Sequence, residues 1–282
     1  MITETAFAKI NLTLSVGKRR DDGYHNIDSV MHSISLHDTV TLEEGNEVTL
    51  EVVRGNAPSG RDNLMVKAAE LFLSERNISR GVHMTLSKEI PSEAGMGGGS
   101  SDAAAVLRGL ARLFGTGDSL DSLAAMGASL GADVPFCVKG GAARCEGIGE
   151  KLTSLPAWEG LPLLILRPDT SVSTGKAYAL LDKREISYED KTELCLQSLY
   201  KKDRKLLFSS LSNDFENVLF SENPLLHETA ETLSSFGRPF LMTGSGSAFF
   251  LFPESREEGL LFRNHIKKSH FPWFAEMAET VK

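Results

Sequence analysis

The sequence has few of the residues that build disulfide or zinc frameworks. Its only cysteines are Cys137, Cys145 and Cys195, an odd number with no CxxC spacing. This pattern indicates neither a disulfide framework nor a zinc site. The seven histidines form no HxxxH or HExxH pair that would place two metal ligands on one helix face. We therefore interpret the cysteines as small core residues and expect no metal held through histidine.

Long apolar runs and an excess of positive charge are also missing. No stretch approaches the roughly 18 apolar residues that a membrane helix requires. The N-terminal MITETAFAKINLTL lacks the basic stretch and apolar block of a secretory signal. The formal charge of -8 argues against a nucleic-acid binder, which normally carries a basic face. We expect a cytoplasmic protein, monomer or homodimer, without a membrane or nucleic-acid partner.

The composition is that of a globular protein, with 41% hydrophobic and 24% charged residues. A chain of 282 residues exceeds the usual size of one hydrophobic core, so two domains are expected. Around residues 153–158 the pattern relaxes into prolines and small residues. We place the boundary there, with domains at residues 1–155 and 156–282.

Residue periodicity predicts a mixed α and β protein. Residues 6–16 alternate in polarity, which predicts a strand with one buried face and with Lys9 and Asn11 on the other. Residues 17–27 carry turn residues and predict a long hairpin loop. Further expected strands are 29–42, 48–53, 82–86, 136–139 and 161–166, and expected helices are 62–76, about 100–114, 119–130, 174–181, 190–199 and 223–236. Residues 239–252 predict a strand, a glycine turn and a strand.

The most informative segment is PSEAGMGGGSSD, residues 91–102. Its four glycines allow backbone conformations and close approaches that a Cβ would block. The segment runs directly into an amphipathic helix beginning near Ser100, whose first N–H groups and dipole attract anions. A flexible linker or a ligand-free turn is the alternative, but such a linker would not normally enter a capped helix. We interpret the segment as a phosphate-binding loop.

The two commonest nucleotide-binding patterns do not fit this loop. No GxxxxGK[ST] sequence occurs anywhere in the chain, which disfavours a Walker A loop. Read from Gly95, the loop gives GMGGGS, with serine where the third glycine of a Rossmann fingerprint belongs. Another class of nucleotide site is therefore expected.

The pattern PxxxGMGGGSSDAA resembles the ATP loop of the GHMP kinase superfamily. The blocks AKINLTLSVGKRRDDGYHNIDSVM, LGADVPFCVKGGAARCEGIGE and LMTGSGSAFF resemble the branch that acts on diphosphocytidyl methylerythritol. The resemblance implies an α+β, two-domain GHMP kinase fold with a ribosomal protein S5 domain 2-like N-terminal domain, a ferredoxin-like C-terminal domain and an active-site cleft between them. The implied reaction is ATP-dependent phosphorylation of the 2-hydroxyl of that small-molecule substrate, with ATP and Mg²⁺, in the non-mevalonate route to isoprenoid precursors.

The same resemblance implies the catalytic residues. Asp133, in GADVPF, matches the family's catalytic base, although an aspartate after a glycine is by itself more often a turn or capping residue. Lys9 matches a second catalytic residue, whose ammonium would keep Asp133 ionised and stabilise charge at the transferring phosphoryl group. The alternative for Lys9 is a solvated strand lysine.

The resemblance also implies residues that contact the two substrates. Those at the acceptor pocket are Asn11, Tyr24, His25 and Tyr178, the aromatic rings holding the cytosine by stacking and hydrogen bonds. Those of the ATP loop are Pro91, Ser92, Glu93, Ala94, Gly95, Met96, Gly97, Gly98, Gly99, Ser100 and Ser101, with Asn63 and Lys88 near the adenine and ribose. A surface position for the Tyr-His pair and an exposed strand end for Lys88 are the alternatives.

Three assignments remain more open. Ser101 is expected to contact Mg²⁺, which bridges phosphates in kinases. Asp102 is left without a role, since it also fits a helix cap. Thr243, Gly244, Ser245 and Gly246 resemble the superfamily's third motif, which supports the phosphate loop, but a purely structural turn is equally compatible.

Two other functions stay open. The first is another kinase of the same superfamily, acting on mevalonate, homoserine or a sugar, which would keep the loop but not the GYH and GADVPF pair. The second is a nucleotide-binding module without chemistry, whose binding would survive loss of Asp133 and Lys9.

Overall fold

The computed structural model describes residues 1–58, 60–183, 190–270 and 272–282, which fall into two compact units. The first unit comprises Met1–Lys9, Leu36–Ser92 and Gly97–Gly140, and the second comprises Ile10–Ser35, Glu93–Met96 and Gly141–Lys282. Two long strands, β1 (Ile2–Arg19) and β2 (His25–Gly45), contribute residues to both units. The expected domain boundary at residues 155 and 156 stays a prediction.

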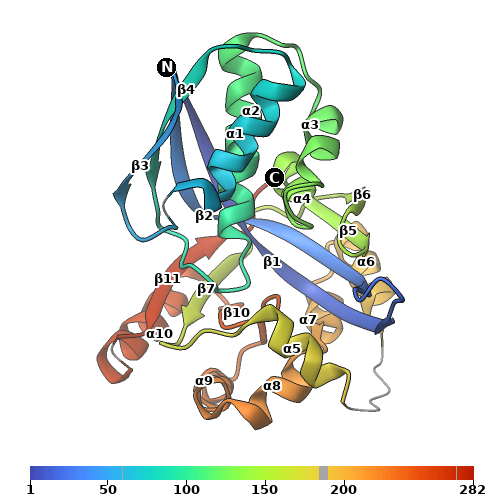
Figure 1. Ribbon diagram of the computed structural model, residues 1–282. Coiled ribbons are helices and arrows are strands. Elements are labelled where there is room, and N and C mark those ends of the chain that lie inside the picture. The colour runs from blue at the N-terminus through green and yellow to red at the C-terminus, as the bar shows by residue number, and fades with distance from the viewer. Residues whose placement is uncertain (59, 184–189, 271) are drawn as a thin grey trace. The chain divides into compact units, whose positions relative to one another are not determined.

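The first unit packs helices on a sheet in which β4 (Gly81–Ser87) lies between β2 and β3 (Val48–Arg54). Strand β4 is antiparallel to β2 and parallel to β3. Helices α1 (Leu64–Glu75) and α2 (Gly98–Phe114) lie side by side over this sheet (Figure 1). Their buried side chains share one core with those of the strands, including Leu42, Phe72, Met84, Leu107 and Leu110. The sheet thus supports the helix that follows the glycine loop.

The connection after α2 differs from the sequence expectation. Helix α3 (Leu120–Gly127) is present, but residues 136–139, expected as a strand, belong to the helix α4 (Val134–Lys139). Pro135 lies in the first turn of α4, where its missing N–H is not needed and its fixed φ suits a helix. A short apolar run such as this cannot be assigned to strand or helix from periodicity alone.

The second unit contains a four-stranded antiparallel sheet in the order β11-β7-β10-β9. Its strands are β7 (Pro162–Arg167), β9 (Phe240–Met242), β10 (Phe249–Leu251) and β11 (Phe274–Glu279). The helices between β7 and β9 are α5 (Thr174–Leu181), α6 (Thr192–Lys201), α7 (Arg204–Ser210), α8 (Glu216–Glu222) and α9 (Pro224–Ser235), and α10 (Arg256–Ser269) connects β10 to β11. Strands in this order with helical crossovers form a ferredoxin-like arrangement, as expected.

The remaining strands of the second unit belong to the same sheet as β1 and β2. Strand β5 (Ala142–Gly147) pairs antiparallel with the first part of β2 and with β6 (Lys151–Leu155), and β8 (Ser212–Asn213) pairs parallel with β1. The hairpin between β1 and β2 is shorter than expected, because β1 continues to Arg19. Residues 8–14 of β1 are buried at every position, so the expectation that only one face of this strand is buried is wrong for these residues.

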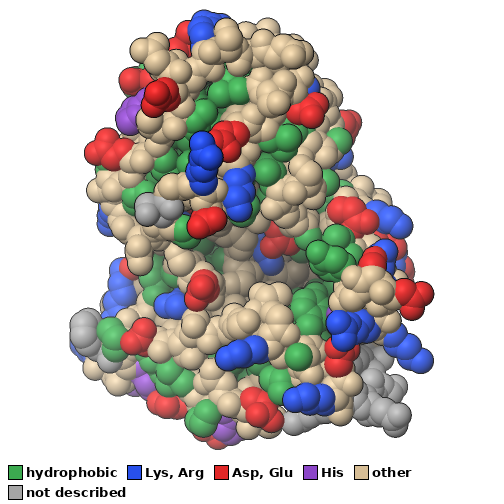
Figure 2. All heavy atoms as spheres, in the orientation of Figure 1, with side chains coloured by type: hydrophobic (Ala, Val, Ile, Leu, Met, Phe, Trp, Pro, Cys, Tyr) green, Lys and Arg blue, Asp and Glu red, His purple; other side chains and the backbone are tan. Residues whose placement is uncertain are grey.

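Charged side chains of both signs are spread over the surface. On the face drawn in Figure 2, lysine and arginine side chains are interspersed with acidic ones. The net charge of -8 is therefore not gathered into one acidic patch on that face. None of the helices in the described ranges is long and apolar enough to cross a membrane.

Candidate active site

An ion pair joins the two predicted catalytic side chains within the first unit. Lys9 Nζ lies 3.6 Å from Asp133 Oδ2, and the lysine is 3% exposed. Asp133 immediately precedes α4 but makes no side-chain capping bond to it. The solvated lysine considered for Lys9 is therefore wrong. Asp133 does lie in the turn before α4, but its carboxylate does not cap the helix. This carboxylate, whose side chain is 30% exposed, is available to a ligand.

The ion pair lies beside the glycine loop. Gly97 precedes α2 with φ +69°, a left-handed conformation suited to glycine. A Cβ placed on Gly97 would be 3.1 Å from Lys9 Cγ and 3.7 Å from Asp133 Oδ2. The first helical hydrogen bond runs from Ser101 N to Gly97 O, so the amides of the preceding residues stand at the open end of α2. The ion pair therefore lies next to the start of α2 in the first unit.

A buried charge cluster in the same unit involves Lys88. The Lys88 ammonium contacts Asp38 Oδ2 and lies 2.8 Å from Asp102 Oδ2. Asp38 Oδ1 also accepts a hydrogen bond from the amide of Ile90 at 2.8 Å, at the entrance to the loop. All three side chains are at least 90% buried, so the exposed strand end considered for Lys88 is wrong. Its contact with adenine or ribose stays a prediction.

Asp102 belongs to this cluster and not to a helix cap. It lies within α2, beyond the first residues of the helix, and its buried Oδ1 atom has no hydrogen-bonding partner among the residues that the structure describes. Burial, together with the charge of Asp38, raises the pKa of the Asp102 carboxyl to about 7, against the opposing effect of Lys88. The sequence pattern assigns no role to Asp102 and does not indicate Asp38, because these residues and Lys88 are distant from one another in the chain.

Two further residues predicted to contact ATP or its Mg²⁺ form hydrogen bonds within the protein. Asn63 caps α1 by accepting from Met65 N at 2.8 Å and donates to Pro58 O at 2.8 Å. Ser101 is 1% exposed and donates its hydroxyl to Phe7 O. The neighbouring Ser100 is partly exposed. The expected roles of Asn63 near adenine and of Ser101 at Mg²⁺ stay predictions.

In the second unit, the turn between β9 and β10 holds the part of the loop that contains Gly95. A Cβ on Gly95 would lie 2.2 Å from Thr243 O, so only glycine allows this approach. The backbones are also joined by a bond from Ala248 N to Ala94 O at 3.1 Å. The side-chain amide of Asn213 donates to Met242 O and Gly244 O at 2.7 and 2.8 Å and thereby braces the turn. This geometry suits the supporting role expected for residues 243–246.

Asn11 lies in a buried polar network in the same unit. Its side chain is 1% exposed and donates to Ser29 Oγ at 2.8 Å, while its backbone N–H donates to Thr243 Oγ1 at 3.0 Å. These bonds connect β1 to β2 and to the supporting turn. Direct contact of Asn11 with the acceptor substrate stays a prediction.

The predicted aromatic residues line a pocket of about 400 Å³ in the second unit. The rings of His25 and Tyr178 are stacked at 4.8 Å with an interplanar angle of 18°, and Tyr24 is 61% exposed. His25 Nε2 lies 2.8 Å from Asp182 Oδ1. The lining residues are Arg19, Gly23, Tyr24, His25, Ile148, Thr174, Gly175, Tyr178, Ala179 and Asp182. Asp182 was missed from the sequence, although it follows Tyr178 by one helical turn.

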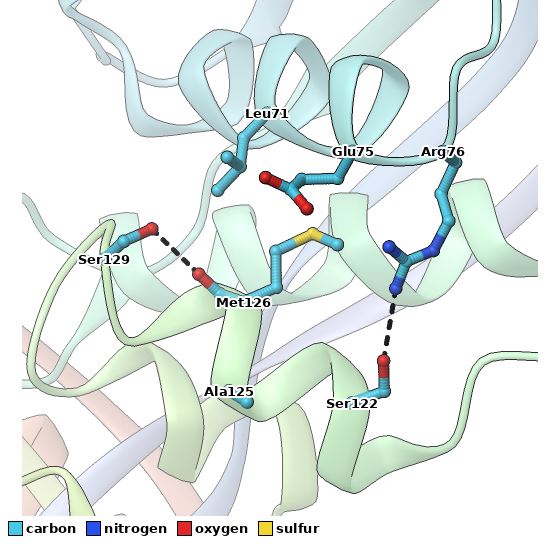
Figure 3. A pocket seen from close by; sticks show the side chains of 7 residues that line it. All are labelled: Leu71, Glu75, Arg76, Ser122, Ala125, Met126 and Ser129. Atoms are coloured by element: carbon cyan, nitrogen blue, oxygen red, sulfur yellow. Dashed lines mark hydrogen bonds between the residues drawn. The ribbon is translucent and has the colours of Figure 1, made fainter.

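A second pocket, of about 280 Å³, contains none of the predicted residues. It lies between α1 and α3, where Arg76 reaches across to Ser122 at 3.1 Å (Figure 3). Arg76 also binds Asp118 through two nitrogens and holds the pKa of that carboxyl well below its usual range. The arginine therefore ties the end of α1 to the start of α3.

Residues 63–141 match the family model of the GHMP kinases N terminal domain, and residues 195–272 match that of the GHMP kinases C terminal domain. A 4-diphosphocytidyl-2-C-methyl-D-erythritol kinase of Acetivibrio thermocellus is 37% identical over 275 residues, covering 97% of each chain. One of Clostridium tetani is 41% identical over 249 residues, covering 88% of this chain and 89% of that one. A crystal structure of 4-(cytidine 5'-diphospho)-2C-methyl-D-erythritol kinase superposes with a TM-score of 0.84 at 32% identity over all of both chains.

Proposed function

This chain belongs to the GHMP kinase family, and we propose that it phosphorylates the 2-hydroxyl of 4-diphosphocytidyl-2-C-methyl-D-erythritol with ATP as donor. The relatives named 4-diphosphocytidyl-2-C-methyl-D-erythritol kinase match most of the chain. Their similarity supports the proposal that this protein catalyses the same step of isoprenoid precursor synthesis. The single observation within the molecule that carries the proposal is the Lys9–Asp133 pair beside the phosphate-binding end of α2.

Phosphoryl transfer needs positioning and neutralisation of charge more than covalent chemistry from the protein. We propose that the triphosphate lies on the amides at the start of α2, where the glycines leave room for it. Asp133 orients the acceptor hydroxyl and takes its proton as the oxygen bonds to the γ-phosphorus. The bond from that phosphorus to the bridging oxygen breaks, and ADP leaves with the electron pair. The Lys9 ammonium stabilises the negative charge that develops on the transferring group.

Mg²⁺ is proposed as part of the MgATP substrate. The described residues contain no group of three or more His, Cys, Asp or Glu side chains that could hold a metal ion. Such a site is not required, because Mg²⁺ in kinases is held largely by phosphate oxygens and water, with one or two protein ligands. Ser101 stays the predicted protein contact, because its hydroxyl can donate its hydrogen to Phe7 O and still offer an oxygen lone pair to a cation.

The pocket of the second unit supports a cytosine-containing acceptor. Stacked aromatic rings, an imidazole and a carboxylate suit a flat base with polar edges, and Tyr24 presents an exposed ring at the same pocket. We propose that Tyr24, His25 and Tyr178 hold the cytosine ring. These residues would then select the substrate, while the ion pair performs the chemistry.

The test is identification of the phosphorylated product by mass. Purified protein is incubated with ATP, Mg²⁺ and, in separate reactions, diphosphocytidyl methylerythritol, mevalonate, homoserine and galactose. We expect one phosphoryl group on the first alcohol alone. Product from another alcohol would indicate a different GHMP kinase, and ATP binding without any product would indicate a non-catalytic module. The variant Asp133→Asn serves as the inactive control.

A further inference from the structure

The interaction of His25 with Asp182 determines how the imidazole is presented in the aromatic pocket. Nε2 lies 2.8 Å from Asp182 Oδ1, while the other carboxylate oxygen lies 3.9 Å from Arg19 NH1. An ionised carboxylate can only accept hydrogen bonds, so the proton of a neutral His25 must be on Nε2. Nδ1 then carries a lone pair, and within the described part of the chain no residue hydrogen-bonds to it.

The orientation of the ring is also held. His25 is 8% exposed, and its ring stacks on Tyr178, which packs edge-on against Phe215 at 5.0 Å. A half-turn of the imidazole about its Cβ–Cγ bond would place Cε1 where Nε2 lies and break the bond to Asp182. The Asp182 carboxylate is not needed to end α5, because the backbone N–H of that residue makes the capping bonds. The Asp182 side chain therefore contacts His25 without also capping the helix.

We infer that Asp182 is a specificity-determining residue, which fixes His25 as a hydrogen-bond acceptor for the exocyclic amino group of cytosine. The inference rests on the proposed function, since it names what selects the base of that substrate. Uracil carries a carbonyl oxygen where cytosine carries the amino group, so two acceptors would face each other. Such a mismatch leaves polar groups unpaired and is strongly rejected at hydrogen-bonding sites. Asp182 acts through His25 and is not itself a catalytic residue.

The first test observes the tautomer directly. Protein labelled with ¹⁵N in histidine is compared with Asp182→Asn, Asp182→Glu and Asp169→Asn, and the His25 signals are assigned with His25→Gln. Asp169 is an exposed aspartate of the same unit and serves as the matched control. We expect the Nε2–H form in the wild type, Asp169→Asn and Asp182→Glu, and a mixture in Asp182→Asn. An Nδ1–H form in the wild type would overturn the inference.

The second test measures base selection. Binding of cytidine and uridine diphosphates is measured at pH 8 with the ATP site saturated by a non-hydrolysable ATP analogue. We expect cytidine diphosphate to bind at least about tenfold more tightly to the wild type. This ratio should fall below about threefold in Asp182→Asn, recover in Asp182→Glu and stay unchanged in Asp169→Asn.

The outcomes separate the inference from the proposed function. If the wild type phosphorylates diphosphocytidyl methylerythritol but Asp182→Asn keeps the full binding ratio, the inference alone is wrong. If the wild type forms no product and binds neither diphosphate, both are wrong. Circular dichroism and the melting temperature verify that each variant is folded, which is expected because the Asp182 side chain is 32% exposed.

Discussion

The Lys9 ammonium lies 3.6 Å from the Asp133 carboxylate, and both side chains lie within 4 Å of the position that a Cβ of Gly97 would occupy. An ammonium, a carboxylate and the start of the α2 helix are thus held close together within one compact unit. Because Asp133 makes no capping bond, its substitution should affect chemistry more than folding.

Asp133→Asn is expected to lower kcat by about 10²–10⁴-fold, the usual contribution of a general base. Steady-state kinetics would show this loss, while calorimetry would show ATP affinity close to that of the wild type. The matched control is Asp62→Asn, an exposed position of the same unit, which should keep full activity. Normal turnover by Asp133→Asn would remove this carboxylate from the mechanism.

Tyr24→Ala is expected to raise KM for the cytidine-containing alcohol by roughly tenfold, because the stacking surface of the exposed ring is lost. KM for ATP should not change. Tyr200→Ala removes a ring of similar exposure, 66% against 61%, from a surface position outside the pocket. Equal effects of the two substitutions on KM for the alcohol would contradict the stacking role.

Gly95→Ala is expected to lower the free energy of unfolding more than Gly117→Ala. Both residues have a left-handed φ, +73° and +71°, and a Cβ there costs about 1–2 kcal/mol. Of these two positions, only Gly95 would bring the Cβ against a backbone atom, Thr243 O at 2.2 Å, whereas no atom of the described residues lies within 4 Å at Gly117. Urea titration of both variants measures the difference, and equal destabilisation would show that the turn can move aside.

Lys88→Met is expected to destabilise the protein by about 3–5 kcal/mol, because Asp38 and Asp102 would remain buried without a counter-charge. Adding Asp102→Asn to this variant should recover part of the loss. Lys67→Met, at an exposed position of α1, is the control and should be near neutral. Urea unfolding gives all four free energies, and a small loss in Lys88→Met would mean that the carboxylates become protonated or hydrated.

Glu216→Gln is expected to stabilise the protein increasingly as the pH rises. Burial raises the pKa of Glu216 to about 7, although Met242 N donates to its carboxylate at 2.7 Å. The folded state therefore binds the proton more tightly than the unfolded state does, and ionisation destabilises the fold between about pH 4.5 and 7. The difference between the unfolding free energies of the variant and the wild type should grow to about 1–3 kcal/mol across that range and then level off. A constant difference would contradict the raised pKa.

Much of the local structure could be predicted, because periodicity reports which faces of an element are buried. The alternation in β1, the apolar stripe of α2 and the turn between β9 and β10 were all visible in the residues. The α4 helix was mistaken for a strand since its apolar run is too short to show a period. Full burial of residues 8–14 was also missed, because Lys9 and Asn11 are polar residues held inside by specific partners.

By itself, the sequence determined that a glycine run enters a helix, and hence that the chain offers amides and a dipole to a phosphate. Only the tertiary structure decided that Asp133 faces Lys9, that Lys88 is buried between Asp38 and Asp102, and that Asp182 holds His25. The physical reason is the sequence separation between the residues that interact. Backbone conformation and burial follow from neighbouring residues, whereas the partner of a charged side chain depends on which distant elements pack against it.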